Sequence, residues 1–139
     1  MINFFNKKKD DNSKNFLLNI ASLLIHAAKI DENYTEKEKN IIKQTLIKLT
    51  NENSNIDELV QKAEETEKNS NQILNFTKEI KTLPNSQKIE IVEALWSIIY
   101  SNQDADIYET NLMRRLAGLL YIDNKVMSDI KEKIKKKFS

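Results

Sequence analysis

Apolar side chains recur along this chain with the three- and four-residue spacing of amphipathic helices. In the first such stretch, Leu17, Ile20 and Leu24 fall on one stripe. The pattern predicts seven helices, at about residues 13–29, 36–49, 56–68, 71–81, 87–100, 107–120 and 124–138. The fifth is the most apolar and is expected at the centre of the core. We therefore predict one compact all-α bundle over residues 13–139, preceded by a flexible basic tail over residues 1–12.

Several residues mark where these helices begin and end. Thr35 and Glu38 form the T-x-x-E pattern of a capping box, and Asp106 and Asp123 are expected to cap the sixth and seventh helices. Pro84 stops the preceding helix, and Asn85 or Ser86 can cap the next one. Gly118 lies inside a predicted helix, where it costs about 1 kcal/mol relative to alanine, so we expect a close helix contact there.

The chain repeats itself at an offset of 71 residues. Ile20 aligns with Ile91, and Leu24 aligns with Leu95. Further aligned pairs are Asp31 with Asn102, Thr35 with Asp106, Glu38 with Glu109, Asn40 with Asn111, and Leu49 with Leu120. Each half thus consists of an apolar helix, an acidic turn, a capped start and a second apolar helix, which predicts an internal pseudo-repeat.

Composition excludes several classes of function. The 139 residues include one Gly, one Pro, one His and no Cys, with a formal net charge of +1. Without cysteine and with a single glycine, the chain has no thiolate zinc site and no glycine-rich phosphate loop. A single histidine also disfavours a poly-His metal site and a conventional Ser-His-Asp triad. The single His26 is expected to be a packed or boundary residue and not a catalytic base. We therefore predict a protein that is not an enzyme and has no cofactor beyond a metal ion.

The charges are concentrated at the two ends of the chain. Residues 1–9 contain three Lys and no acid, and residues 125–139 contain six Lys and two acids, so the body between them is acidic. This distribution disfavours nucleic-acid binding. It leaves two alternatives for the ends: solvated lysines beside a docked C-terminal helix, or contact with an anionic membrane surface. We expect a cytoplasmic protein, with a peripheral position at the inner face of the membrane as the alternative.

The two acidic turns are the candidate functional site. Each offers oxygen atoms at the end of one helix and a carboxylate in the first turn of the next, a donor set that suits Ca²⁺ or Mg²⁺. Helix capping and the helix dipole explain the same residues without a metal. Both interpretations stay open from the residues alone.

These segments resemble the TerB (tellurite-resistance protein B) family. The segment 23–38 is similar to the family's A-x-A-D-G stretch with its following D/T-x-x-E, and 94–117 is similar to its second copy. The likeness covers about residues 15–135, and the superfamily includes the N-terminal domain of membrane-anchored DnaJ-like co-chaperones. It implies an all-helical fold of about seven helices with internal pseudo-symmetry.

The resemblance also implies a divalent-cation site formed by both turns. The ligands carried over by position are Asp31, Glu38, Asn102, Asp106 and Glu109. Asn102 replaces an Asp and removes a charge, Glu32 and Gln103 replace the family's usual Gly, and Tyr121 stands where a helix-ending Gly is frequent. Fewer charges weaken cation affinity, so we expect a weakly bound Ca²⁺ or Mg²⁺ in a stress-response adaptor whose protein partner and oligomeric state are open. The alternative is a partner-binding or membrane-surface scaffold with no metal role.

Overall fold

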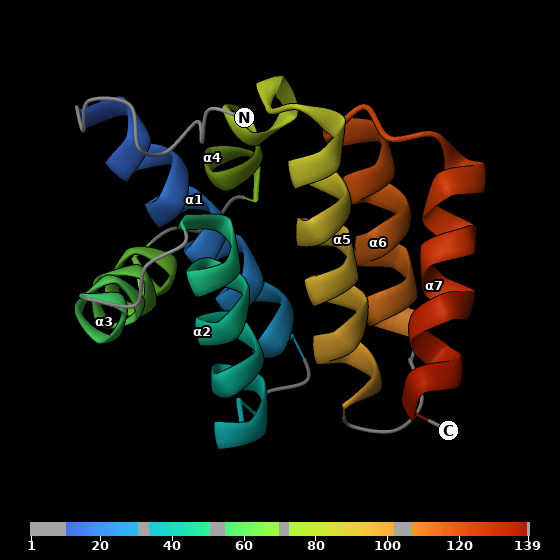
Figure 1. Cartoon of the computed structure of the whole chain (residues 1–139), viewed down its shortest axis with the longest axis horizontal. Helices are drawn as coiled ribbons and strands as arrows, with labels where there is room; N and C mark the ends of the chain where they lie inside the picture. Colours follow the sequence, from blue (N-terminus) through green and yellow to red (C-terminus); the bar gives the residue numbers. More distant parts are fainter. Residues whose placement is uncertain (1–10, 31–33, 51–54, 70–72, 102–106, 139) are drawn as a thin grey trace.

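The computed structural model describes residues 11–30, 34–50, 55–69, 73–101 and 107–138, and these segments are helical (Figure 1). Their α-helices are α1 (Asp11–Ala28), α2 (Glu36–Thr50), α3 (Ile56–Lys68), α4 (Leu74–Thr77), α5 (Asn85–Tyr100), α6 (Ile107–Leu119) and α7 (Asn124–Phe138). A short 3-10 helix, η2 (Ile80–Thr82), follows α4. No strand occurs in the described segments, so the predicted all-α fold with seven α-helices is confirmed.

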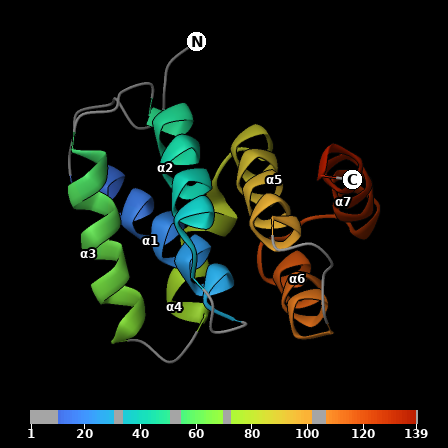
Figure 2. The same ribbon diagram turned by 90° about the horizontal axis from the view of Figure 1, so that it is seen from below.

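Two similar halves make up the bundle. In Figure 2, α1 and α5 lie side by side at the centre, α3 and α7 lie at opposite outer edges, and α2 and α6 lie on opposite sides of the central pair. The halves are thus related by an approximate half-turn about the line of sight. The predicted repeat relates α1 to α5 and α2 to α6, and the structure confirms it; the same half-turn also relates α3 to α7, which the repeat had not included.

The core is built on the aligned apolar positions of the repeat. Ile20 and Leu24 on α1 are fully buried, and so are their counterparts Ile91 and Leu95 on α5. Helix α5 therefore occupies the centre as expected, but it shares that place with α1. Burying a leucine or isoleucine side chain contributes about 1.5–3 kcal/mol, so these equivalent positions are a main source of the bundle's stability.

The fourth predicted helix is wrong in its extent. Instead of one helix over 71–81, the described part contains the single turn α4 and then η2. Two asparagines and Thr77 lie in this stretch and Thr82 follows it, and their short polar or branched side chains favour turns over a continuing helix. Thr82 Oγ1, for example, donates to the carbonyl oxygen of Glu79 at 2.7 Å.

Helix α5 starts differently from the prediction as well. Pro84, and neither Asn85 nor Ser86, occupies the N-cap position, and no side chain caps the helix there. The carbonyl oxygen of Pro84 accepts from the backbone N–H of Gln87 at 3.0 Å and of Lys88 at 3.1 Å. The fixed backbone angle of proline suits a helix start, and its missing N–H would have had no partner within the helix.

The expectation for Gly118 is also wrong. Gly118 is exposed, and a Cβ atom built on it would meet nothing within 4 Å. The glycine-like position lies three residues later, where Tyr121 adopts a left-handed backbone with φ 59°. The N–H of Ile122 donates to Ala117 O at 2.9 Å and that of Tyr121 donates to Gly118 O at 3.3 Å, as in a Schellman helix end.

Helix α7 docks on the core through its apolar stripe. Ile130 and Ile134 are buried against α5, whereas Phe138 is 38% exposed. The expected cap of this helix is confirmed, because Asp123 Oδ1 accepts from the N–H of Lys125 at 2.9 Å. No helix in the described part of the chain has the length and apolar character needed to cross a bilayer.

Candidate functional site

The acidic positions of the repeat sit at one end of the bundle. Helices α1 and α5 end there, and α2 and α6 begin there, at the lower end of the molecule in Figure 1. Glu38 lies in the first turn of α2 and Glu109 in the first turn of α6. The other three predicted ligands, Asp31, Asn102 and Asp106, lie outside the described residues.

Glu38 completes the predicted capping box. Its Oε1 accepts from the backbone N–H of Thr35 at 2.8 Å and from Thr35 Oγ1 at 3.2 Å. In return, Thr35 Oγ1 accepts from the backbone N–H of Glu38 at 3.1 Å. The capping interpretation is therefore confirmed for the first turn.

Both described carboxylates are unusually buried. Glu38 is 1% exposed and Glu109 is 4% exposed. Taking a carboxylate out of water costs several kcal/mol unless nearby groups compensate for it. The positive end of a helix dipole favours an anion in the first turn, and neighbouring groups engage both side chains.

The described residues alone do not assemble a metal centre. Within them, no cluster of three or more histidine or acidic side chains is placed to hold an ion. Glu38 and Glu109 can each supply carboxylate oxygens, the donors that hard divalent cations prefer. A complete site at this end of the bundle would need oxygen donors from the turns as well.

A polar network links the start of α2 to α3, and no sequence pattern indicated it. Tyr34 Oη donates to Glu64 Oε2 at 2.9 Å, and Lys39 Nζ lies 3.3 Å from the same oxygen. Burial raises the pKa of Tyr34 well above its usual range, and the bond to Glu64 raises the pKa further. The phenol therefore stays protonated as a donor and holds the entry to α2 in place.

His26 has a structural role, as expected. Its Nδ1 lies 3.2 Å from Glu67 Oε2, and Lys29 Nζ lies 2.8 Å from Glu67 Oε1. These contacts join the end of α1 to the end of α3. Arg114 in α6 is exposed and donates from Nη1 to Asn111 Oδ1 at 3.2 Å.

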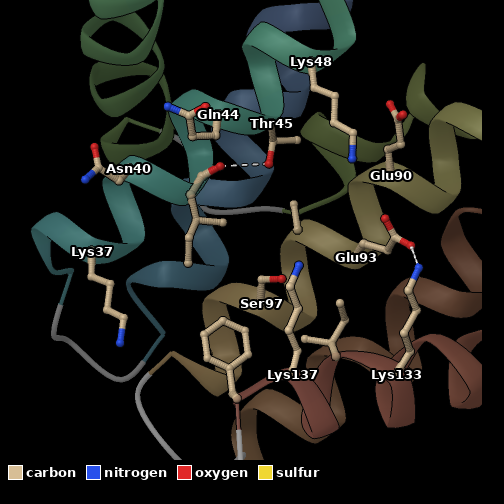
Figure 3. A pocket seen from close by; sticks show the side chains of 14 residues that line it. Lys37, Asn40, Gln44, Thr45, Lys48, Glu90, Glu93, Ser97, Lys133 and Lys137 are labelled. Atoms are coloured by element: carbon tan, nitrogen blue, oxygen red, sulfur yellow. Dashed lines mark hydrogen bonds and ion pairs between the residues drawn. The ribbon is translucent and has the colours of Figure 1, made fainter.

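A groove of about 540 Å³ lies between α2, α5 and α7 (Figure 3). Its floor is one face of α5, and its two walls come from α2 and α7. The lining residues are Lys37, Asn40, Ile41, Gln44, Thr45, Lys48, Glu90, Glu93, Ala94, Ser97, Lys133, Ile134, Lys137 and Phe138. We call it the α2–α5–α7 groove. Sequence reasoning missed it, because a groove depends on how three distant segments pack.

The fold and the two acidic helix starts define a class of small repeated helical modules with acidic corners. The chain matches the family model described as tellurite resistance protein TerB over residues 17–132, and it belongs to that family. The resemblance inferred from the sequence is thereby confirmed. No curated protein and no solved structure is significantly similar to this chain.

Proposed function

We propose that this TerB-family module is not an enzyme and binds a divalent cation, Ca²⁺ or Mg²⁺, weakly at its acidic end. The observation that carries the proposal is the placement of Glu38 and Glu109. They occupy equivalent positions of the two halves, both are buried, and both lie at the end of the bundle where α2 and α6 begin. Asp31, Asn102 and Asp106 would complete the oxygen set.

The mechanism is electrostatic. A cation shared between the two halves would offset the free-energy cost of burying the carboxylates. It would also link the α1–α2 corner to the α5–α6 corner and restrict their relative movement. Cation occupancy would then control which protein partner the module binds, and the module would act as an adaptor in a stress response. Asn102 supplies a neutral carbonyl where a carboxylate would bind more tightly, which is why the affinity should be low.

Isothermal titration of the full chain with Ca²⁺ and Mg²⁺ tests the proposal. Glu109→Gln removes a charge at nearly constant shape, and Glu38→Gln does so while keeping a residue type that can still complete the capping box. We expect both variants to lose the binding heat, whereas Glu58→Gln, in the exposed first turn of α3, should keep it. Asn102→Asp should raise the affinity. Absence of heat in the wild-type chain, or equal heat in all variants, would remove the cation from the function.

The capping geometry favours a second candidate function. The bonds between Thr35 and Glu38 explain an acid at this position without a metal. In that case the module is a partner-binding or membrane-surface scaffold, and its thermal melting would be the same in Ca²⁺ and in a chelator. A cation-dependent rise in Tm that Glu109→Gln abolishes would contradict this alternative.

A further inference from the structure

The pseudo-symmetry of the bundle gives the α2–α5–α7 groove a counterpart in the first half. The floor of the groove consists of Glu90, Glu93, Ala94 and Ser97, four residues on one face of α5. At the repeat offset, the equivalent residues on α1 are Asn19, Ser22, Leu23 and His26. The two faces can therefore be compared residue by residue.

On α1, this face is covered by the chain itself. The segment of α4 and η2 packs along it, and Figure 2 shows α4 on the opposite side of α1 from α2. Asn19 Nδ2 donates to Glu79 Oε1 at 3.2 Å, and the ring centroid of His26 lies 6.5 Å from that of Phe76. Phe76 is 2% exposed.

On α5, the equivalent face is open. In Figure 3, Ser97 and Glu93 on α5 lie between the lining side chains of α2 and those of α7, and these three helices border the groove. The α2 wall runs from Lys37 to Lys48, which corresponds to about 16 Å of helix. That length suits an added helix of about three turns. Such a helix would occupy the position on α5 that is equivalent to the position of α4 on α1.

The walls determine the charge of the occupant. The groove is lined by four lysines and only two glutamates. The lysines are Lys37, Lys48, Lys133 and Lys137. Glu93 is already paired with Lys133 at 2.7 Å, and among the described residues no ion pair is recorded for the other three lysines. Ile41 and Phe138 add apolar surface to the two walls. An apolar ridge flanked by carboxylates would match both features.

We propose that the α2–α5–α7 groove binds an acidic amphipathic helix of a partner protein, which takes on the second half the place that α4 takes on the first. A lipid surface fits less well, because Ala94 on the floor and Ile134 on the α7 wall are only 5% and 2% exposed. A flat bilayer cannot reach residues at that depth, whereas the side-chain ridge of a helix can. This site is separate from the proposed cation site.

The chain's own covering segment supplies the probe. It is a fluorescein-labelled, amidated peptide that copies residues 73–83, with Lys78→Glu and Lys81→Glu, and the unaltered copy serves as the control peptide. The apolar spacing of Ile73, Phe76 and Ile80 is kept, while the net charge changes from +1 to −3. Fluorescence anisotropy with the full chain in EDTA keeps the result independent of any bound cation. We expect the acidic peptide to bind at least about tenfold more tightly than the copy, with a difference that shrinks in salt.

Variants of equal charge inside and outside the groove test whether the acidic peptide binds in the α2–α5–α7 groove. Lys48→Glu with Lys137→Glu should weaken the acidic peptide about tenfold or more. Lys62→Glu with Lys135→Glu, which changes the net charge equally at exposed lysines outside the groove, should have little effect. Ser97→Phe fills the floor without a change of charge and should abolish binding, and circular dichroism verifies that each variant is folded.

Three results would overturn the proposal. The first is equal affinity for the two peptides, and the second is equal loss in the two double variants, which would indicate nonspecific attraction. The third is a chain that does not bind the acidic peptide but binds phosphatidylglycerol vesicles, and that loses the vesicle binding in the Lys48→Glu with Lys137→Glu variant. That outcome would assign the lysines to a membrane surface.

Discussion

Lys88 offers a sharp test of how the second half is held together. It lies in the first turn of α5, is 6% exposed, and donates from Nζ to the carbonyl oxygen of Leu120 at 2.8 Å. Leu120 follows the last residue of α6 and is fully buried. The amine thus satisfies a carbonyl at a helix C-terminus, where a cation is also favoured by the helix dipole.

The contribution of this bond to the free energy of unfolding can be estimated for Lys88→Met, a substitution that keeps the length of the side chain. A hydrogen bond from a charged donor contributes about 1.5–3 kcal/mol, and a buried carbonyl left without its partner costs about 1–3 kcal/mol. Relief from burying the amine offsets part of this loss. We expect Lys88→Met to lower the free energy of unfolding by about 1–2 kcal/mol, equivalent to a fall in Tm of about 3–8 °C for a chain of this size.

Lys81→Met is the matched control. Lys81 Nζ and Lys88 Nζ lie over the same Tyr121 ring, at 5.5 and 5.8 Å from its centroid. The change at position 81 therefore removes a similar cation–π contact, worth about 0.5–1 kcal/mol at an exposed site. Urea denaturation of the two variants isolates the bond to Leu120. Equal losses in the two variants, or an unchanged stability of Lys88→Met, would refute this account of the helix end.

The same residue gives a pH dependence. Burial lowers the pKa of the Lys88 amine below the ordinary value for a lysine. Between the folded and unfolded pKa values the unfolded chain binds more protons, so the contribution of Lys88 to stability rises with pH up to the unfolded value. The neutral amine still donates to Leu120. The stability difference between wild type and Lys88→Met should therefore widen toward pH 10, and a narrowing difference would show that the charged form is the favoured one.

Three further substitutions test local features by thermal or urea unfolding. Gly118→Ala should stabilise the protein by about 0.5–1 kcal/mol, because the added Cβ meets open space inside a helix; a loss of stability would show a close contact there after all. Thr35→Ala should cost about 1 kcal/mol through loss of the capping box, and Thr35→Ser should restore most of it. Asp123→Ala should cost a similar amount at the start of α7, because the N–H of Lys125 loses its acceptor; an unchanged Tm would mean that water replaces the cap.

The fold was predictable because apolar periodicity and local caps carry most of the information for helices. The apolar stripe predicted α3 at its observed bounds, and Thr35 marked the start of α2. The stretch 71–81 was harder to predict, because its apolar spacing is helical while its two asparagines and Thr77 favour turns. Gly118 was misread for a related reason: propensity gives the cost of a glycine but not its surroundings.

The candidate site was predictable in part. Residue type and spacing placed carboxylates in the first turns of α2 and α6, and the structure buries both. The bond from Tyr34 to Glu64 and the contact of His26 with Glu67 join residues 30 and 41 positions apart. Such pairs depend on how α1 and α2 pack on α3, which no local pattern in the sequence specifies.

Comparison of the two halves distinguishes the core positions, which both halves share, from the surface positions, which differ between them. Core positions such as Leu24 and Leu95 keep the same residue, because equivalent helices must fill equivalent space. The faces that carry α4 on α1 and the groove on α5 have diverged, since Asn19 and Ser22 correspond to Glu90 and Glu93. Small polar side chains allow the chain's own segment to lie close, whereas ionised side chains need water or a charged partner. The second half thus leaves open a surface that the first half covers, and this difference, more than the shared core, is where the two halves can take on separate roles.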